Sequence, residues 1–95
     1  MFPNNKIISM DFEKSLQDTI FNMLTDSRYM FYGLFLAELN KSFDDEFPTA
    51  CVGKHPNSPI IQLIIGKKFW EKTLYNDSRR KFILIHELNF GLLVQ

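Results

Sequence analysis

Apolar residues near the start of the chain recur every three or four positions. They are Phe12, Leu16, Ile20 and Met23, with Phe21 and Leu24 beside them. This spacing is typical of one face of an amphipathic helix. Ser9 and Asp11 stand just before the run, and both residue types cap helix N-termini. The pattern therefore predicts a first helix that begins near one of these two residues.

A second apolar run follows almost directly. Its members are Met30, Phe31, Leu34, Phe35, Leu36 and Leu39. Asp26 and Ser27 precede it as the predicted cap, and Pro48 ends any helix beyond it. We expect this run to form a second helix with its apolar face in the core. For its aromatic residues, core packing is the first interpretation, and an exposed hydrophobic docking edge is the alternative.

The pattern changes after Pro48. Residues 49–53 form a short apolar segment, and residues 60–65 are rich in isoleucine and bounded by Pro and Gly. Both segments are typical of strands, and the composition of residues 54–59 between them is typical of a turn. The pattern predicts an antiparallel β-hairpin. A lone hairpin is unstable in water, so helices must pack on it.

Two further helices are predicted after the hairpin. The first is short and covers residues 68–74, and the second is capped by residues 76–78. The last helix carries a mostly core-facing set: Phe82, Ile83, Ile85, Leu88, Asn89, Leu92 and Leu93. The predicted fold class is α+β, with two N-terminal helices, a β-hairpin, a short helix and a C-terminal helix. We expect residues 1–95 to form a single domain.

Composition narrows the class of protein. The chain has 95 residues, of which 45% are hydrophobic, and its formal net charge is zero. A protein that coats DNA or RNA is normally basic, so nucleic acid is not the expected partner. The single cysteine, Cys51, allows no internal disulfide and fits a reducing compartment. With no targeting signal and no apolar stretch of about 18 residues, we expect a cytoplasmic protein without a membrane span.

Charge is distributed unevenly between the two halves. Residues 1–50 hold four basic and eight acidic side chains, a net of −4, and residues 51–95 hold seven basic and three acidic, a net of +4. Solvated faces, or mutual attraction of the halves, would explain this. The alternative is a patch that docks a charged partner. The candidate partner-binding residues are Asp44, Asp45 and Glu46 in an acidic run, and Arg79, Arg80 and Lys81 in a basic run.

One motif in the last helix suggests chemistry. His86 and Glu87 match the start of the HExxH pattern, in which two histidines one helical turn apart bind zinc and the glutamate acts on the metal-bound water. Phe90 occupies the second histidine position and cannot bind zinc. We expect its ring to fill the space that a metal would otherwise take.

The surrounding residues carry a family resemblance. Residues 28–34 are an aromatic-rich helix, residues 44–50 read DDEFPTA, and residues 63–70 lead from a strand into a short aromatic helix. Together with His86 and Glu87, these motifs resemble the metallopeptidase-like domain that often precedes a von Willebrand A-like domain in bacterial and phage proteins. The resemblance covers residues 26–95 and implies a zincin-like C-terminal helix.

The resemblance assigns roles to four positions. It places the first zinc ligand on His86, the general base on Glu87, the second ligand on Phe90 and the last ligand on Gln95. Since neither Phe90 nor Gln95 supplies a suitable ligand, His86 and Glu87 are interpreted as relics of a metal site. No cofactor is therefore expected. A zinc site remains the alternative, and it would require His55, Cys51 and the acidic run to converge on His86. For Cys51 itself we expect a buried, inert thiol, which is the usual state of a cysteine in an apolar strand.

The sequence thus predicts a degenerate metallopeptidase-like protein without catalysis. Its expected role is a protein–protein interaction module, and the occurrence of the family implies a phage or mobile-element inhibitor or modulator of a host protein. A homodimer is compatible with so apolar a small chain. The first alternative is a zinc-dependent hydrolase whose site is incomplete or completed by a partner. The second is a nucleic-acid-binding module that uses the basic C-terminal half.

Overall fold

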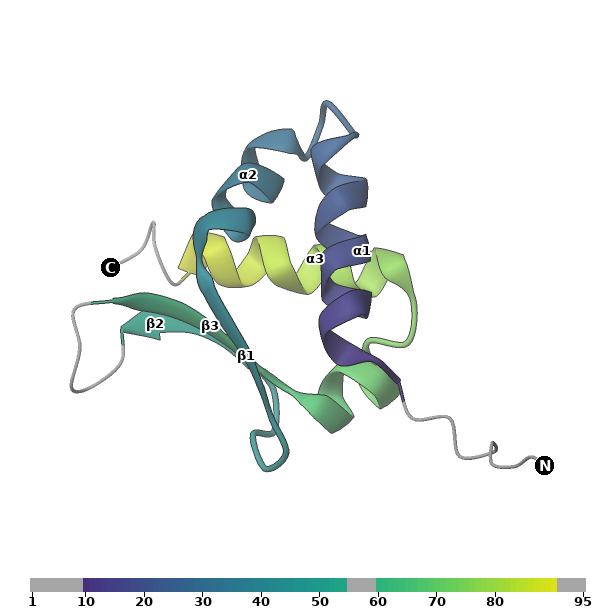
Figure 1. Ribbon diagram of the computed structural model, residues 1–95, viewed down its shortest axis with the longest axis vertical. Helices are drawn as coiled ribbons and strands as arrows, with labels where there is room; N and C mark the ends of the chain where they lie inside the picture. Colours follow the sequence, from purple (N-terminus) through teal and green to yellow (C-terminus); the bar gives the residue numbers. More distant parts are fainter. Residues whose placement is uncertain (1–9, 55–59, 91–95) are drawn as a thin grey trace.

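The computed structural model describes residues 10–54 and 60–90. The elements, in chain order, are the helices α1 (Phe12–Leu24) and α2 (Met30–Glu38), the strands β1 (Asn40–Asp44), β2 (Ala50–Lys54) and β3 (Ile61–Gly66), the short π-helix η2 (Phe69–Thr73) and the helix α3 (Asp77–Leu88). The fold is α+β, as the sequence predicts, and it comprises helices packed on a small sheet (Figure 1).

The ends of α1 and α3 follow from capping chemistry. The Asp11 carboxylate accepts a hydrogen bond from the Lys14 amide at 3.1 Å, and the Asn76 side chain accepts one from the Arg79 amide at 2.9 Å. Each cap satisfies an amide that has no partner inside its helix. The predicted starts of both helices are therefore confirmed.

The sheet contains the predicted hairpin and one strand more. β2 and β3 pair antiparallel, with Val52 opposite Leu63. β1 pairs with the other edge of β3 in parallel, with Phe43 opposite Ile65, so the strand order is β1-β3-β2. The sequence analysis did not predict β1. Its place in the sheet depends on a partner about 20 residues further along the chain, which is invisible to a local pattern.

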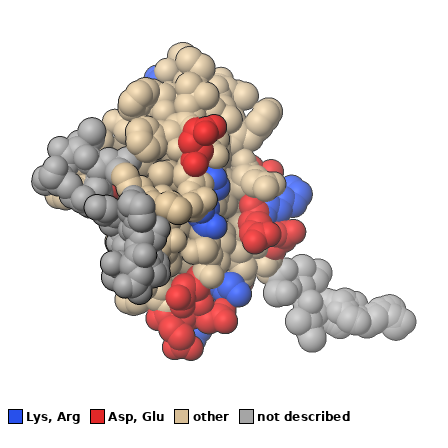
Figure 2. Space-filling view, turned by 60° about the vertical axis from the view of Figure 1, so that its left-hand side comes forward, with Lys and Arg blue, Asp and Glu red and all other residues tan. Residues whose placement is uncertain are grey.

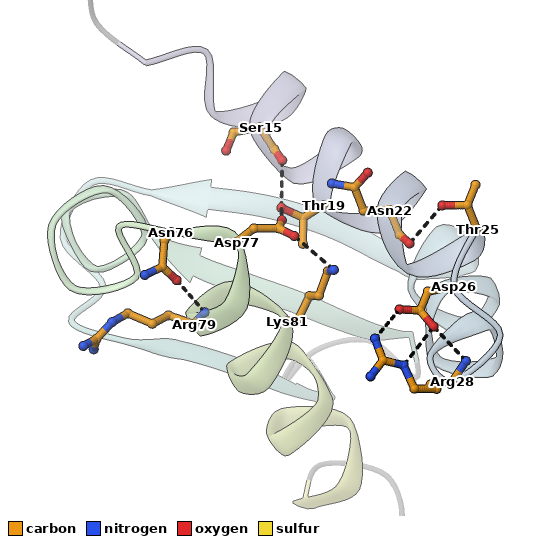
Figure 3. A network of polar contacts seen from close by, with 10 residues as sticks. All are labelled: Ser15, Thr19, Asn22, Thr25, Asp26, Arg28, Asn76, Asp77, Arg79 and Lys81. Carbon is orange, nitrogen blue, oxygen red and sulfur yellow. Dashed lines mark hydrogen bonds and ion pairs between the residues drawn. The ribbon is translucent and has the colours of Figure 1, made fainter.

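The two faces of the sheet differ in burial. Ala50, Val52, Leu63 and Ile65 are buried on the face that α3 crosses (Figures 1 and 3). Successive residues of a strand point to opposite faces, so Cys51 points away from this core. Its side chain is exposed, and the expectation of a buried thiol was wrong.

Gly66 ends β3 where two backbone segments meet. Its amide donates to the Thr49 carbonyl at 2.7 Å. A Cβ at this position would overlap the carbonyl of Phe47. The turn between β1 and β2 can therefore fold against the end of β3 only because residue 66 has no side chain.

The largest fully buried side chain of the core is the chain's single tryptophan. Trp70 is fully buried, and its indole N–H donates to the Ser15 hydroxyl at 2.9 Å. The Arg80 guanidinium lies 4.8 Å from the ring centroid and donates to the carbonyls of Leu74 and Trp70. The other buried apolar residues of the core are Leu16, Ile20, Met23, Leu36, Ala50, Val52, Leu63, Ile65, Leu74, Leu84 and Leu88.

Three expectations about the helices were wrong. The N-cap residue of α2 is Tyr29, which makes no side-chain cap hydrogen bond, because the Asp26 carboxylate is engaged with Arg28 instead. Of the apolar face predicted for this helix, only Leu36 is buried. In α3, Leu84 and Leu88 are buried, whereas Phe82 is 67% exposed. Leu92 and Leu93 lie outside the described residues.

Candidate functional site

The histidine of the sequence motif lies on an exposed strip of α3. His86 is exposed, with its ring 6.2 Å from the Phe82 ring and 4.4 Å from the Phe90 ring. The three side chains follow one another at four-residue steps, which places them on one side of the helix. Phe90 is 57% exposed. The expectation that its ring fills a former metal cavity was wrong.

Among the residues that the structure describes, those around His86 do not form a set of zinc ligands. A structural or catalytic zinc ion needs three or four converging protein ligands. The described residues offer one imidazole between two phenyl rings, and they contain no group of three His, Cys, Asp or Glu side chains placed to hold a metal. His55 and Gln95 lie outside the described residues. The role of His86 and Glu87 as relics stays a prediction.

The acidic run forms the exposed turn between β1 and β2. The Asp44 carboxylate accepts hydrogen bonds from the amides of Glu46 and Phe47 at 2.7 and 3.2 Å. Asp45 forms an ion pair with Lys67 at 3.0 Å. Asp44 therefore shapes the turn, and Asp45 joins the acidic half of the chain to the basic half. A partner-binding role for this run stays a prediction.

The basic run is divided among three separate sets of contacts. Arg80 is half-buried against Trp70, and burial lowers its pKa from the ordinary value. The Arg79 guanidinium lies 4.5 Å from the Tyr75 ring centroid, at the surface. The Lys81 ammonium pairs with the Asp77 carboxylate at 3.1 Å, and Asp77 in turn accepts a hydrogen bond from Thr19 of α1 (Figure 3). The three residues do not make one continuous cationic surface.

An unusual feature of the described surface is the apolar side of α2. Four of its side chains are exposed: Met30 by 47%, Phe31 by 69%, Leu34 by 56% and Phe35 by 40%. We call these four residues the α2 face. The rings of Phe31 and Phe35 lie 6.4 Å apart in an edge-to-face contact. In Figure 2 the upper part of the molecule, over α2 and the end of α1, carries few charged atoms compared with the lower part.

Local contacts explain why this side of α2 points outwards. Gly33 and Leu36 are buried on the opposite side, and a Cβ at Gly33 would lie only 3.0 Å from the Leu24 amide nitrogen of α1. The Lys41 ammonium donates to the last carbonyls of the helix, including that of Leu36 at 2.9 Å. The Tyr32 hydroxyl reaches Asn89 beyond α3 at 3.4 Å. These contacts fix the rotation of α2, and that rotation leaves the α2 face outside.

A groove lies beside the start of α2. It has a volume of about 540 Å³ and runs between the turn before α2 and the exposed strip of α3, with Arg28, Tyr29, Lys81 and His86 in its lining. The Arg28 and Lys81 cations lie 5.0 and 5.8 Å from the Tyr29 ring centroid. Hydrogen bonds from Arg28 lower the pKa of Asp26 to about 2. Each of the two cations therefore already has an acidic partner, Asp26 or Asp77.

Comparisons with known proteins leave the site to be interpreted from its own geometry. The chain matches no family model, no curated protein and no solved structure. In the part of the chain that the structure describes, no helix is long and apolar enough to cross a membrane.

The sequence analysis named the aromatic part of the α2 face as an alternative docking edge, but it assigned Met30 and Leu34 to the core. The sequence did contain a signal that this helix would be only partly buried. The segment from Met30 to Glu38 is apolar on every side, and a helix of that kind needs an enclosing core. A 95-residue domain buries too small a fraction of its surface to enclose such a helix completely.

Proposed function

We propose that the protein is a non-catalytic protein–protein interaction module that docks through the α2 face. The observation that carries this proposal is the exposure of four large apolar side chains on one short helix. Together they present roughly 400 Å² of contiguous apolar surface, which is comparable to the largest apolar patch of a typical monomer, and such patches are often functional. A surface of this kind lowers its free energy by burial against another protein.

The rigidity of the surface supports the same role. α2 is held by the close approach at Gly33 and by the Lys41 ammonium at its C-terminal end. A preorganised apolar face loses little conformational entropy on binding. The resemblance to degenerate metallopeptidase-like domains agrees with a binding role, and within this proposal the protein is an inhibitor or modulator encoded by a phage or mobile element.

A zinc-dependent hydrolase remains a second candidate because His86 and Glu87 are adjacent on α3. It requires ligands beyond the single imidazole on this strip. Its decisive measurement is zinc content by elemental analysis, with Glu87→Ala as the activity control. A nucleic-acid-binding role receives less support, since the basic residues of α3 are committed to contacts within the fold.

The docking role is tested by replacing one phenylalanine with the photo-crosslinking residue p-benzoylphenylalanine in the source cell. The test position is Phe31, which is 69% exposed on α2, and the matched control is Phe82, which is 67% exposed on α3. We expect light to join the protein to a partner of defined mass only when the probe is at position 31. A product of twice the 11.2 kDa chain mass identifies a second copy, and any other mass identifies a different protein.

Two results would reject the proposal. The first is equal crosslinking from both positions, or crosslinking from position 82 alone. The second is stoichiometric zinc in the purified protein together with a hydrolytic activity that Glu87→Ala abolishes.

A further inference from the structure

The α2 face is complementary to itself. Met30, Leu34 and Glu38 follow one another at four-residue steps, so they form a single row along α2. Phe31 and Phe35 form the neighbouring row. Leu34 is at the middle of the helix, and no charged residue lies between it and Met30 on this side. A two-fold axis at Leu34 would place the same apolar rows against each other in antiparallel helices, as an isologous contact requires.

The two ends of α2 differ in how their charge is balanced. At the C-terminal end, the Lys41 ammonium donates to the carbonyls of Leu36, Ala37 and Leu39 at 2.8–3.2 Å. At the N-terminal end, the cap residue makes no side-chain hydrogen bond, and the first turn holds no acidic residue. The positive end of the helix dipole therefore lacks the negative side chain that would stabilise it.

Antiparallel pairing supplies that negative charge. With Leu34 on the axis, the partner's Glu38 lies opposite Met30, at the uncapped start of α2. Glu38 is exposed in the single chain, and the Arg28 cation, which pairs with Asp26 but keeps 73% of its side chain exposed, stands just before the same helix end. A carboxylate there interacts favourably with both the helix dipole and the guanidinium. Glu38 is the only acidic residue of α2, and it stands at the position that this pairing uses.

The net charge of the chain and the area buried in the contact also favour a second copy of the chain as the partner. The chain's formal net charge is zero, so two copies approach without long-range repulsion. Two α2 faces together bury roughly 800 Å² of apolar surface, and the rim around them brings the contact towards the lower end of specific interfaces. Small contacts of this kind are typical of weak, transient association, so we look for a reversible dimer with a Kd of about 1–100 μM.

We infer that the α2 face binds the α2 face of a second copy of this chain, as an antiparallel two-fold helix pair. This inference rests on the proposed docking function and names its partner. A foreign protein seated on the same face is the competing outcome.

The inference is tested by sedimentation of the purified protein from about 1 to 300 μM, a span that covers the expected Kd. We expect wild type to shift from one to two chain masses across this range. Leu34→Asp brings two carboxylates together at the axis, so it should raise Kd at least about 30-fold. The matched control is Phe82→Asp, which makes a comparable change at an exposed position of α3 and should dimerise as wild type does.

Glu38 gives a second test that keeps the α2 face intact. We expect Glu38→Gln to raise Kd about threefold and Glu38→Lys about tenfold, and added salt should shrink both differences. The melting temperature of the dilute monomer should not fall, because Glu38 makes its proposed contact only in the dimer and a carboxylate at the C-terminal end of a helix adds no stability there.

Three results would overturn the inference. They are a wild-type chain that stays monomeric at every concentration, a dimer that Phe82→Asp dissociates and Leu34→Asp does not, and a dimer insensitive to both changes at Glu38. If wild type is monomeric and a probe at position 31 still crosslinks a different protein, the pairing with a second copy is rejected and the docking function is supported. If neither a dimer nor any crosslink forms, the pairing and the docking function are both rejected.

Discussion

The surroundings of Trp70 and the face of α2 are two apolar regions with opposite relations to solvent. Trp70 is fully buried, its indole N–H is satisfied by Ser15, and Arg80 covers its ring. The α2 face also contains aromatic rings, yet its side chains are 40–69% exposed. The difference shows that hydrophobicity alone does not decide burial. Trp70 lies where three helical segments converge, whereas α2 packs mainly on α1.

The largest expected effect is at the buried region. Trp70→Ala removes the largest fully buried side chain and leaves Ser15 and Arg80 without their aromatic neighbour. We expect the free energy of unfolding to fall by about 3–5 kcal/mol, measured by chemical denaturation followed by circular dichroism. A loss below about 1 kcal/mol would contradict this expectation.

A smaller effect is expected at the cation that covers Trp70. Arg80→Met keeps an unbranched apolar stem but removes the donors to the carbonyls of Leu74 and Trp70. We expect a loss of about 1–3 kcal/mol, because half-buried carbonyls lose their partner. Arg79→Met is the matched control, since Arg79 is exposed, and it should change stability by less than about 0.5 kcal/mol. Equal losses would contradict the structural role of Arg80.

The α2 face should behave in the opposite way. Phe31→Ser removes a ring that is 69% exposed, so the dilute monomer should change in stability by less than about 0.5 kcal/mol. The same substitution should weaken docking, which separates binding from folding. Thermal unfolding at low concentration and sedimentation at high concentration measure the two effects. A loss of stability comparable to that of Trp70→Ala would show that α2 belongs to the core after all.

The smallest expected effect is on the stability of the fold at low pH. The pKa of Asp26 lies at about 2, chiefly because the Arg28 side chain donates hydrogen bonds to its carboxylate. A lowered folded-state pKa stabilises the fold above the unfolded value near 4, and this contribution is lost as the pH falls below about 4 and through the folded-state pKa of about 2. We expect Asp26→Asn to reduce stability slightly at pH 7 and much less at pH 2. The measurement is the denaturation midpoint of the variant and of wild type at both pH values. An equal difference at the two pH values would contradict the prediction.

The fold was predictable from the sequence wherever a pattern was local. The three-to-four-residue spacing in α1, the caps Asp11 and Asn76 and the β-branched run of β3 each reflect interactions between near neighbours in the chain. β1 was not predictable in this way, because its residues Asn40–Asp44 include only one strong strand former, Phe43, and their hydrogen-bonding partner is β3.

The candidate site was predictable only in part. The aromatic run of α2 drew attention as a possible docking edge, but a helix that is apolar on all sides does not reveal which side the fold covers. That choice depends on the close approach at Gly33 and on the reach of Lys41 from β1. Neither contact is visible in the periodicity of α2, because Gly33 meets a residue of α1 and Lys41 reaches back from β1. The acidic and basic runs were visible in the sequence, but their division among a turn, a core cation and surface pairs was not.

The strand order has a consequence for the synthesis of the protein. β1 and β2 are neighbours in the chain, yet they do not pair with each other, because β3 lies between them. A nascent chain that ends before residue 61 therefore contains both edges of the sheet and nothing to hold them together. Because β1 and β2 each pair only with β3, this sheet requires Ile61–Gly66 to have left the exit tunnel.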